Sequence, residues 1–344
     1  MTDGTSRSET TIDEELAQRI TALGEGRTSG LKLREGVLSL VLDVAGLDEA
    51  TRNALGERIK RAAELSPEIE HVRIAMTAEK AVRPLILAVG SGKGGVGKST
   101  LAANLAVALH RKGKRVGMVD ADIYGPSLPR LLASEGVKPE AQGSKLIPVP
   151  NVHGIPMLSM GHLAKPGQAI AWRGPMAGNA LGQLIDAEWR DIDLLVVDLP
   201  PGTGDVQLTM IQKYKPVGAV IISTPQDLAL IDAARAVSFF EQAHVPVIGM
   251  VENMAGYVCP HCGEVSDPFG TGGAEAAAAD MGLPFLGRVP LEMAIRVASD
   301  AGAPPATGDG ATAIPFLAIA DRVAAWLDER AGGRLGGHTG SPIG

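Results

Sequence analysis

Aromatic residues are scarce in this sequence, at 3% of the chain, and cysteine occurs only twice, at Cys259 and Cys262. Because 45% of the residues are hydrophobic, a sizeable core is possible, but it must be built mainly from aliphatic side chains. Two cysteines cannot make the disulfide framework of a small secreted domain. We therefore expect a cytoplasmic protein.

Positive charge and long apolar runs are also lacking. The formal net charge is −7 and the sequence pI is about 5.6, which argues against a sequence-independent nucleic-acid surface. No run approaches the roughly 18 apolar residues of a membrane span. The first residues are polar and do not resemble an apolar signal segment. We therefore expect neither nucleic acid nor a membrane among the partners.

A glycine-rich stretch, Gly-Ser-Gly-Lys-Gly-Gly-Val-Gly-Lys-Ser-Thr, occupies residues 90–100. It follows a short apolar run at residues 84–89, typical of a buried parallel strand, and precedes a run of helix-forming residues at 101–110. Residues 92–99 match the pattern G-x-x-x-x-G-K-S/T in the strand–loop–helix context that indicates a phosphate-binding P-loop.

The parts of this loop suit the phosphates of ATP. Glycines let backbone N–H groups turn toward phosphate oxygens, and the helix N-terminus adds partial positive charge. We expect Lys98 to reach the β- and γ-phosphates and the Ser99 hydroxyl to ligate Mg²⁺. The residues expected to contact ATP in this loop are Gly92, Lys93, Gly94, Gly95, Val96, Gly97, Lys98, Ser99 and Thr100.

Lys93 adds a second lysine directly after the first glycine of the motif. A solvated surface lysine is the simplest interpretation of such a residue. The run Lys-Gly-Gly-Val-Gly-Lys-Ser-Thr, however, resembles the deviant Walker A motif of the family that contains MinD, ParA and the nitrogenase iron protein. That resemblance implies a homodimer in which Lys93 reaches the partner's nucleotide, so we expect both Lys93 and Lys98 to serve catalysis.

Acidic residues follow two other predicted strands. Asp120 and Asp122 come after the strand at 115–119, and Asp198 ends the apolar strand at 193–197. Functional groups of open α/β sheets collect at the carboxyl ends of strands, so we expect Asp120 and Asp198 to help hold Mg²⁺. In the deviant Walker family the second aspartate of the first segment orients or deprotonates the attacking water. This resemblance implies a catalytic role for Asp122, with N-capping of a helix as the alternative.

Residues 198–205, Asp-Leu-Pro-Pro-Gly-Thr-Gly-Asp, closely resemble switch II of the Mrp/ApbC family of iron–sulfur proteins. Residues 172–176, Trp-Arg-Gly-Pro-Met, and residues 288–292, Arg-Val-Pro-Leu-Glu, also resemble segments of that family. Asn253 follows the sixth predicted strand, and its amide has a donor and an acceptor that can read a base edge. The resemblance implies that Asn253 contacts adenine.

Cys259 and Cys262 lie in the sequence Cys-Pro-His-Cys, shortly after Asn253. Two soft thiolates at this spacing can share one metal centre, but one pair is only half of a tetrahedral site. Zinc, a site that includes His261, and an unligated turn are all compatible with the spacing. The Mrp/ApbC family carries this motif at this point, and the resemblance implies a labile [4Fe-4S] cluster held between two subunits.

The order of predicted elements indicates two folded parts. Residues 84–330 alternate strands and helices, which predicts an α/β P-loop NTPase domain with a doubly wound, mostly parallel sheet. Residues 11–80 predict a small α+β domain, with helices at 12–23 and 47–65 and strands at 38–44 and 72–76. It resembles the N-terminal domain often fused to Mrp/ApbC-type proteins. We expect residues 1–10 and 331–344 to be disordered.

Together these motifs predict an iron–sulfur cluster carrier that binds ATP, hydrolyses it slowly and transfers its cluster to apo iron–sulfur proteins. A MinD/ParA-like positioning ATPase is the first alternative. It would need a basic amphipathic C-terminal helix or a basic surface, and the glycine-rich end of this sequence supplies neither. A zinc-stabilised regulatory ATPase is the second alternative.

Overall fold

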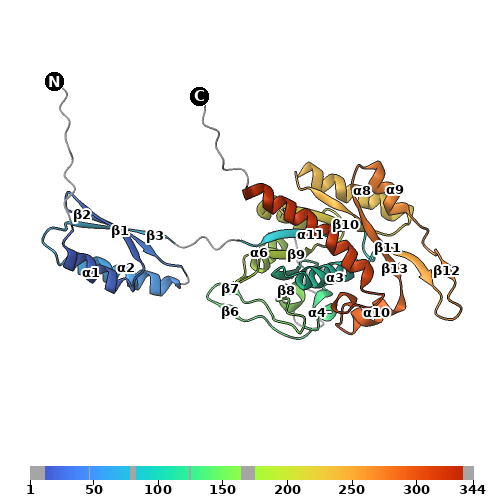
Figure 1. Cartoon of the computed structure of the whole chain (residues 1–344), viewed down its shortest axis with the longest axis horizontal. Coiled ribbons are helices and arrows are strands. Elements are labelled where there is room, and N and C mark those ends of the chain that lie inside the picture. The colour runs from blue at the N-terminus through green and yellow to red at the C-terminus, as the bar shows by residue number, and fades with distance from the viewer. Residues whose placement is uncertain (1–11, 46, 78–82, 124, 164–174, 336–344) are drawn as a thin grey trace, which may run out of the picture. The chain divides into compact units, whose positions relative to one another are not determined.

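The computed structural model describes residues 12–45, 47–77, 83–123, 125–163 and 175–335. The chain divides into two compact units, residues 1–83 and residues 84–344 (Figure 1). The segments expected to be disordered, 1–10 and most of 331–344, lie outside the described residues. Residues 172–174 of the Trp-Arg-Gly-Pro-Met segment also lie outside the described residues.

The N-terminal unit is a three-stranded sheet with two helices packed on one face (Figure 1). In chain order its elements are α1 (Glu14–Leu23), β1 (Thr28–Arg34), β2 (Val37–Asp43), α2 (Glu49–Ala63) and β3 (His71–Thr77). β2 is central, antiparallel to β1 and parallel to β3. Strand β1 was not predicted, because as an edge strand it buries only Leu33 and so lacks a clear apolar alternation. The predicted α+β character is confirmed.

Aspartates start both helices of this unit, and an aliphatic core holds them to the sheet. Asp13 accepts from the backbone N–H of Glu15 at 3.3 Å, and Asp48 accepts from that of Thr51 at 2.8 Å. The buried side chains include Ile20, Leu38, Leu40, Leu42 and Ile59. This core contains no residue of the second unit.

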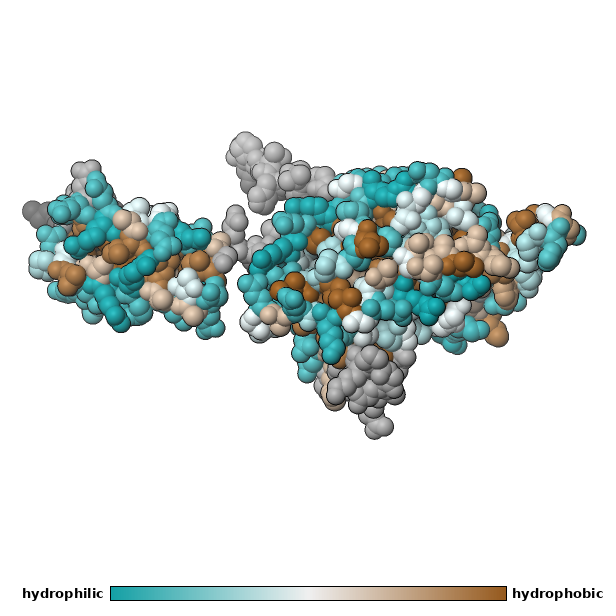
Figure 2. Space-filling view, turned by 90° about the horizontal axis from the view of Figure 1, so that it is seen from below, coloured by the Kyte–Doolittle hydropathy of each residue, from teal (hydrophilic) through white to brown (hydrophobic). Residues whose placement is uncertain are grey.

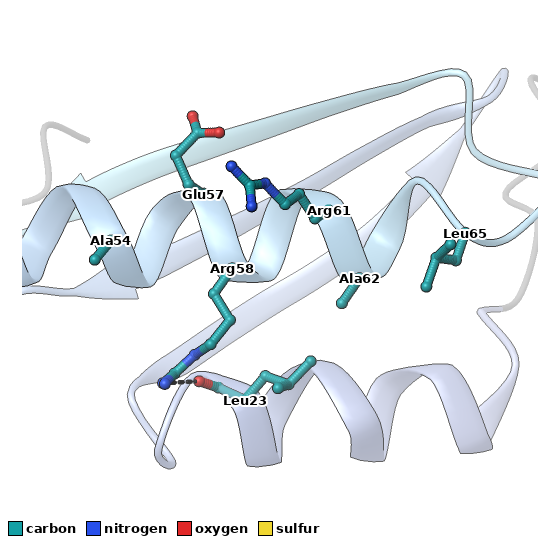
Figure 3. A pocket seen from close by; sticks show the side chains of 7 residues that line it. All are labelled: Leu23, Ala54, Glu57, Arg58, Arg61, Ala62 and Leu65. Carbon is teal, nitrogen blue, oxygen red and sulfur yellow. Dashed lines mark hydrogen bonds between the residues drawn. The ribbon is translucent and has the colours of Figure 1, made fainter.

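An open groove of about 580 Å³ lies between α1 and α2 (Figure 3). Arg58 crosses it from α2 and donates to the carbonyl oxygen of Leu23 at 2.6 Å and to Glu25 at 2.8 Å. These bonds fasten α2 to the end of α1. The residues that line the groove are Leu23, Ala54, Glu57, Arg58, Arg61, Ala62 and Leu65.

The second unit is built on an eight-stranded sheet, which confirms the predicted doubly wound α/β fold. The strand order is β12-β11-β10-β4-β9-β5-β8, and β13 pairs with β11. All these pairs are parallel except the pair between β11 and β12. The strands are β4 (Leu85–Gly90), β5 (Val116–Asp120), β8 (Met157–Ser159), β9 (Leu194–Asp198), β10 (Gly218–Ser223), β11 (Val247–Val258), β12 (Val265–Ser266) and β13 (Phe285–Leu291).

Helices cover both faces of this sheet. On one face, α3 (Lys98–Arg111), α4 (Leu128–Leu131), α10 (Met293–Asp300) and α11 (Ile314–Leu335) pack on alternate strand residues such as Leu87. On the other face, α6 (Pro175–Ile185), α7 (Asp205–Thr209), α8 (Asp227–Gln242) and α9 (Gly273–Asp280) pack on the intervening ones such as Ala88. Most of the buried hydrophobic side chains on both faces are aliphatic, as the low aromatic content requires.

Shorter elements complete the unit, and one helix is longer than expected. The short elements are β6 (Ala141–Gln142), β7 (Lys145–Leu146), α5 (Met160–Leu163), a π-helix (Met210–Tyr214) that continues α7, and a 3-10 turn (Pro305–Thr307). Helix α11 continues to Leu335, past residue 330 where we expected it to end. Among the described residues, no helix is long and apolar enough to cross a membrane.

Strand β11 differs most from the sequence prediction. The apolar run at residues 246–251 predicts a strand that ends before the polar pair Glu252 and Asn253, but β11 runs to Val258. Its far end pairs with β12 in a hairpin, with Val258 opposite Val265. This hairpin projects at the right of Figure 1, and the valines expose 46% and 65% of their surface at its base. Apolar residues also show at this end of the molecule in Figure 2.

Because the two units have separate cores, we predict that they can be destabilised separately. Ile59 is completely buried in the N-terminal unit, so Ile59→Ala should destabilise that unit by about 2–5 kcal/mol. Hydrogen exchange should show lost protection in residues 12–77 and unchanged protection in the sheet of the second unit. Leu65→Ala is the control, since Leu65 is 78% exposed. Loss of protection throughout both units would contradict this prediction.

Candidate functional site

The phosphate loop joins β4 to α3 at the carboxyl edge of the sheet. Helix α3 begins at Lys98, and its N-cap Gly97 has a left-handed backbone with φ of 83°. Gly95 is also left-handed, with φ of 79°. Lys93, Gly94 and Gly95 are exposed at the surface of the loop. The predicted phosphate-binding residues therefore form one turn around the start of α3, the arrangement that backbone N–H groups need to bind an anion.

Two glycines of this loop are required by packing as well as by phosphate geometry. A Cβ on Gly92 would lie 2.0 Å from the carbonyl carbon and oxygen of Asp232 in α8. A Cβ on Gly97 would lie 2.1 Å from the Nδ2 atom of Asn253 in β11. The loop is thus fitted closely between two elements that come much later in the chain.

Lys98 is the centre of the site. Its side chain is buried, and its Nζ donates to Asp198 Oδ1 at 2.6 Å. Asp122 Oδ2 lies 4.0 Å from the same Nζ, and Ser99 Oγ lies 3.5 Å from it. Residues predicted from separate motifs therefore meet at one ammonium group.

Asp120 is completely buried on β5, opposite Asp198 on the neighbouring strand β9. Its carboxylate accepts from the N–H of Asp122 at 3.1 Å, the N–H of Leu128 at 3.1 Å and the hydroxyl of Ser159 at 3.0 Å. Burial, followed by repulsion from Asp198, raises the pKa of Asp120 to about 7. Asp120 thus fixes the turn that carries Asp122.

Asp198 has one carboxylate oxygen on Lys98, whereas its other oxygen, Oδ2, has no hydrogen-bond partner among the described residues. The side chain is fully buried, and burial raises its pKa. A buried acceptor without a partner is costly and is the kind of group that a cation or its water ligands satisfy. Asp198 and the neighbouring Ser99 hydroxyl therefore fit a Mg²⁺ ion.

Asp122 lies in the turn after β5 and exposes 14% of its side chain. Its Oδ1 accepts from the N–H of Gly125 at 3.2 Å, which orients the carboxylate. The remaining oxygen faces Lys98 at 4.0 Å. This carboxylate is partly accessible to water and lies next to the lysine expected on the γ-phosphate.

Asn253 lies against the phosphate loop, where its Nδ2 donates to the carbonyl oxygen of Val96 at 2.8 Å. Its neighbour Glu252 is completely buried and accepts from the N–H of Ala274 at 2.8 Å and from Arg288 Nε at 3.0 Å. Sequence reasoning gave no role to Glu252. The sequence signal for such a role was the position of Glu252 directly after an apolar strand, because an acidic side chain buried there must have hydrogen-bond or charge partners.

Cys259 and Cys262 lie in the turn of the β11–β12 hairpin. The turn is closed by bonds from Cys259 N–H to the Glu264 carbonyl and from Gly263 N–H to the Cys259 carbonyl, both 2.9 Å. Cys259 is partly exposed and Cys262 is exposed. The backbone N–H groups of Cys262 and then His261 lower the pKa of the Cys259 thiol. Such amide donors favour a thiolate, the form that binds metal.

The hairpin offers only two thiols. Across the described residues, no group of three or more His, Cys, Asp and Glu side chains is arranged to hold a metal ion. His261 and the two cysteines are therefore not arranged as a three-ligand group among the described residues.

Fold and site together define a P-loop nucleotide-binding protein. The sequence matches the family described as ParA, NUBPL iron-transfer P-loop NTPase, over residues 83–324, and the chain belongs to that family. The iron–sulfur cluster carrier protein of Pseudomonas fragi is 48% identical over 234 residues, which are 67% of this chain and 82% of that protein. The iron–sulfur protein required for NADH dehydrogenase of Arabidopsis thaliana mitochondria is 51% identical over 222 residues, 64% of this chain and 70% of that protein.

Solved structures agree on the fold. The nucleotide-binding protein of Archaeoglobus fulgidus in complex with ADP has a TM-score of 0.56 and 40% identity, covering 63% of this chain and 86% of that chain. The cell-division ATPase MinD of Pyrococcus furiosus has a TM-score of 0.51 and 21% identity, covering 70% of this chain and 99% of that chain. At this identity the likeness to MinD shows the fold alone.

The buried carboxylates predict a pH-dependent stability in the absence of Mg²⁺ and nucleotide. The ordinary pKa of aspartate is 3.8, whereas that of Asp120 is about 7, so between these values the folded protein keeps a proton that the unfolded chain has released. The free energy of unfolding should therefore fall as pH rises through this window. Urea unfolding in EDTA at a series of pH values measures this slope, which Asp120→Asn should reduce. An equal slope in both proteins would contradict the assignment to Asp120.

Proposed function

We propose that this protein binds and hydrolyses ATP, carries a [4Fe-4S] cluster between two copies of the chain, and transfers that cluster to apo iron–sulfur proteins. One observation supports this proposal most directly. Strand β11 holds Asn253 against the phosphate loop and ends at the hairpin that carries both cysteines. A single strand therefore connects the nucleotide site with the two thiols. The names of the relatives, iron–sulfur cluster carriers, agree with this cargo.

In this proposal the phosphate loop of residues 92–100 binds the phosphates, and the buried Lys98 provides the fixed positive charge. Ser99 and Asp198 would hold Mg²⁺, with Asp120 as the supporting carboxylate on the neighbouring strand. When bound, the ion neutralises charge on the β- and γ-phosphates. Asn253 reads adenine with the donor and acceptor left over from its bond to Val96.

Asp122 orients the water that attacks the γ-phosphate. Its carboxylate is held by the N–H of Gly125 and lies 4.0 Å from Lys98 Nζ. Lys93, exposed at the loop surface, completes the site of the partner subunit in a homodimer. A positioned carboxylate and a second lysine suit slow hydrolysis that depends on assembly of two chains.

The cluster lies where two hairpins meet. A cubane cluster takes four thiolates, and each chain supplies two, at Cys259 and Cys262. A two-fold axis brings both pairs to one point. Because Cys262 is exposed and the hairpin stands at the edge of the sheet, the cluster would lie near solvent, which suits transfer better than storage.

We predict that Asp122→Asn leaves ATP binding intact and lowers turnover by about 10²–10⁴-fold, because only the water-orienting group is lost. Binding is measured by calorimetry and turnover by phosphate release. Asp280→Asn is the control, since Asp280 is exposed at the end of α9. Normal turnover in Asp122→Asn would remove this residue from the mechanism.

We also predict that Cys259→Ala and Cys262→Ala each eliminate the cluster after anaerobic reconstitution while ATP binding survives, because the thiols lie outside the phosphate loop. His261→Ala is the matched control from the same turn and should retain the cluster. Iron and sulfide analysis should give one cluster per two chains. Stoichiometric zinc in each chain, with no iron uptake, would instead favour a zinc-stabilised ATPase.

A further inference from the structure

Gln207 is a buried amide in the first turn of α7, directly after the loop of residues 199–204 that resembles switch II. Only 2% of its surface is exposed. Its Nε2 donates to the carbonyl oxygens of Pro200 at 2.6 Å, Pro201 at 3.3 Å and Gly202 at 3.1 Å. One side chain thus contacts three successive carbonyl groups of this loop.

The composition of this loop explains why the side chain that contacts it must be a hydrogen-bond donor. Two of the three residues are prolines, which have no backbone N–H, and Gly202 has a left-handed backbone with φ of 85°. The loop therefore has few donors of its own with which to hold its shape. All three facing atoms are acceptors, so the side chain must present N–H groups, and a glutamine amide supplies two.

Other groups of residues 199–202 contact the end of β4 and the phosphate loop that follows it. The N–H of Gly202 donates to the carbonyl of Ser91 at 3.0 Å, and the N–H of Leu199 donates to the carbonyl of Val89 at 3.1 Å. A Cβ added to Gly94 would lie 3.8 Å from Pro201. Residues 199–202 are thus held by β4 and the phosphate loop through their N–H groups and packing, and by Gln207 through their carbonyl oxygens.

We propose that Gln207 is a positioning residue for ATP hydrolysis: it holds loop 199–204 against the phosphate loop, next to the buried Lys98–Asp198 pair. This inference rests on the hydrolysis proposed above. Without the amide, the three carbonyls lose their donor, and the glycine-containing loop moves away to find water. The phosphate loop itself keeps its contacts to α8 and β11, so nucleotide binding is retained while the hydrolytic geometry is lost.

The test compares Gln207→Met, which keeps the length and removes the donor, with Gln207→Glu, which keeps the shape and replaces the donor with an acceptor. Gln212→Met is the control, because Gln212 is exposed on the π-helix that continues α7. Both Gln207 variants should lower kcat by about 10- to 100-fold, as a misplaced group of an active site does. Affinity for ADP should be unchanged, and Gln212→Met should match the parent in both.

Hydrogen exchange of the peptide that spans residues 199–206 gives a readout independent of turnover. In both Gln207 variants these amides should exchange faster, while the amides of β4 and α3 exchange at the parental rate. A folded Gln207→Met protein with parental kcat and parental exchange in this peptide would overturn the inference. In the unmodified protein, exchange of this peptide as fast as in an unstructured chain would also overturn it, whatever the variants do.

The design separates this inference from the proposed function. If the unmodified protein binds ATP without hydrolysing it, the proposed hydrolysis fails. Faster exchange in Gln207→Met would then still support the holding role of Gln207, and parental exchange would refute it.

Discussion

The buried ion pair between Lys98 and Asp198 is the contact on which the site depends. Val89, near the end of β4, pairs with Asp198 at the end of β9, so two adjacent parallel strands deliver the phosphate loop and the acid to the same edge. A buried ion pair contributes little net stability, because both charges lose water, whereas loss of one partner costs about 3–5 kcal/mol. A charge pair at this position is therefore weak evidence for a role in folding, and it agrees with the phosphate and metal roles proposed for Lys98 and Asp198.

The same strand, β11, contacts the phosphate loop and leads to the two thiols. Glu252 fastens β11 to the start of α9 and to Arg288, and Asn253 fastens the same strand to the phosphate loop at Val96. Five residues further on, the strand enters the cysteine hairpin. A displacement of the phosphate loop can therefore be transmitted to the cysteine hairpin along a hydrogen-bonded strand, without a flexible linker between them. This arrangement gives a physical route by which nucleotide state could influence cluster holding.

The sequence predicts those features of the fold and the site that depend on short contiguous motifs. The apolar strands ending at Asp120 and Asp198 and the glycine loop before Lys98 are contiguous motifs, so the doubly wound α/β fold and the clustering of Lys98, Asp122 and Asp198 could be predicted. The full length of β11 could not be anticipated, because the polar pair Glu252 and Asn253 resembles a strand end and only the pairing with β12 across the cysteine turn shows that the strand continues. Glu252 and Gln207 were missed for a similar reason: each satisfies buried groups of other segments, and no local pattern reveals such partners.

Transfer of a cluster tests the central claim most directly. The protein is reconstituted without oxygen, freed of unbound iron and sulfide, and mixed with an apo iron–sulfur enzyme whose activity reports cluster arrival. We predict that the enzyme gains activity in the presence of an iron chelator, which intercepts free iron, and that Cys259→Ala protein gives no gain. Reconstituted protein that holds a cluster yet never activates the recipient, or that activates it equally well without Cys259, would contradict the proposed role as a carrier.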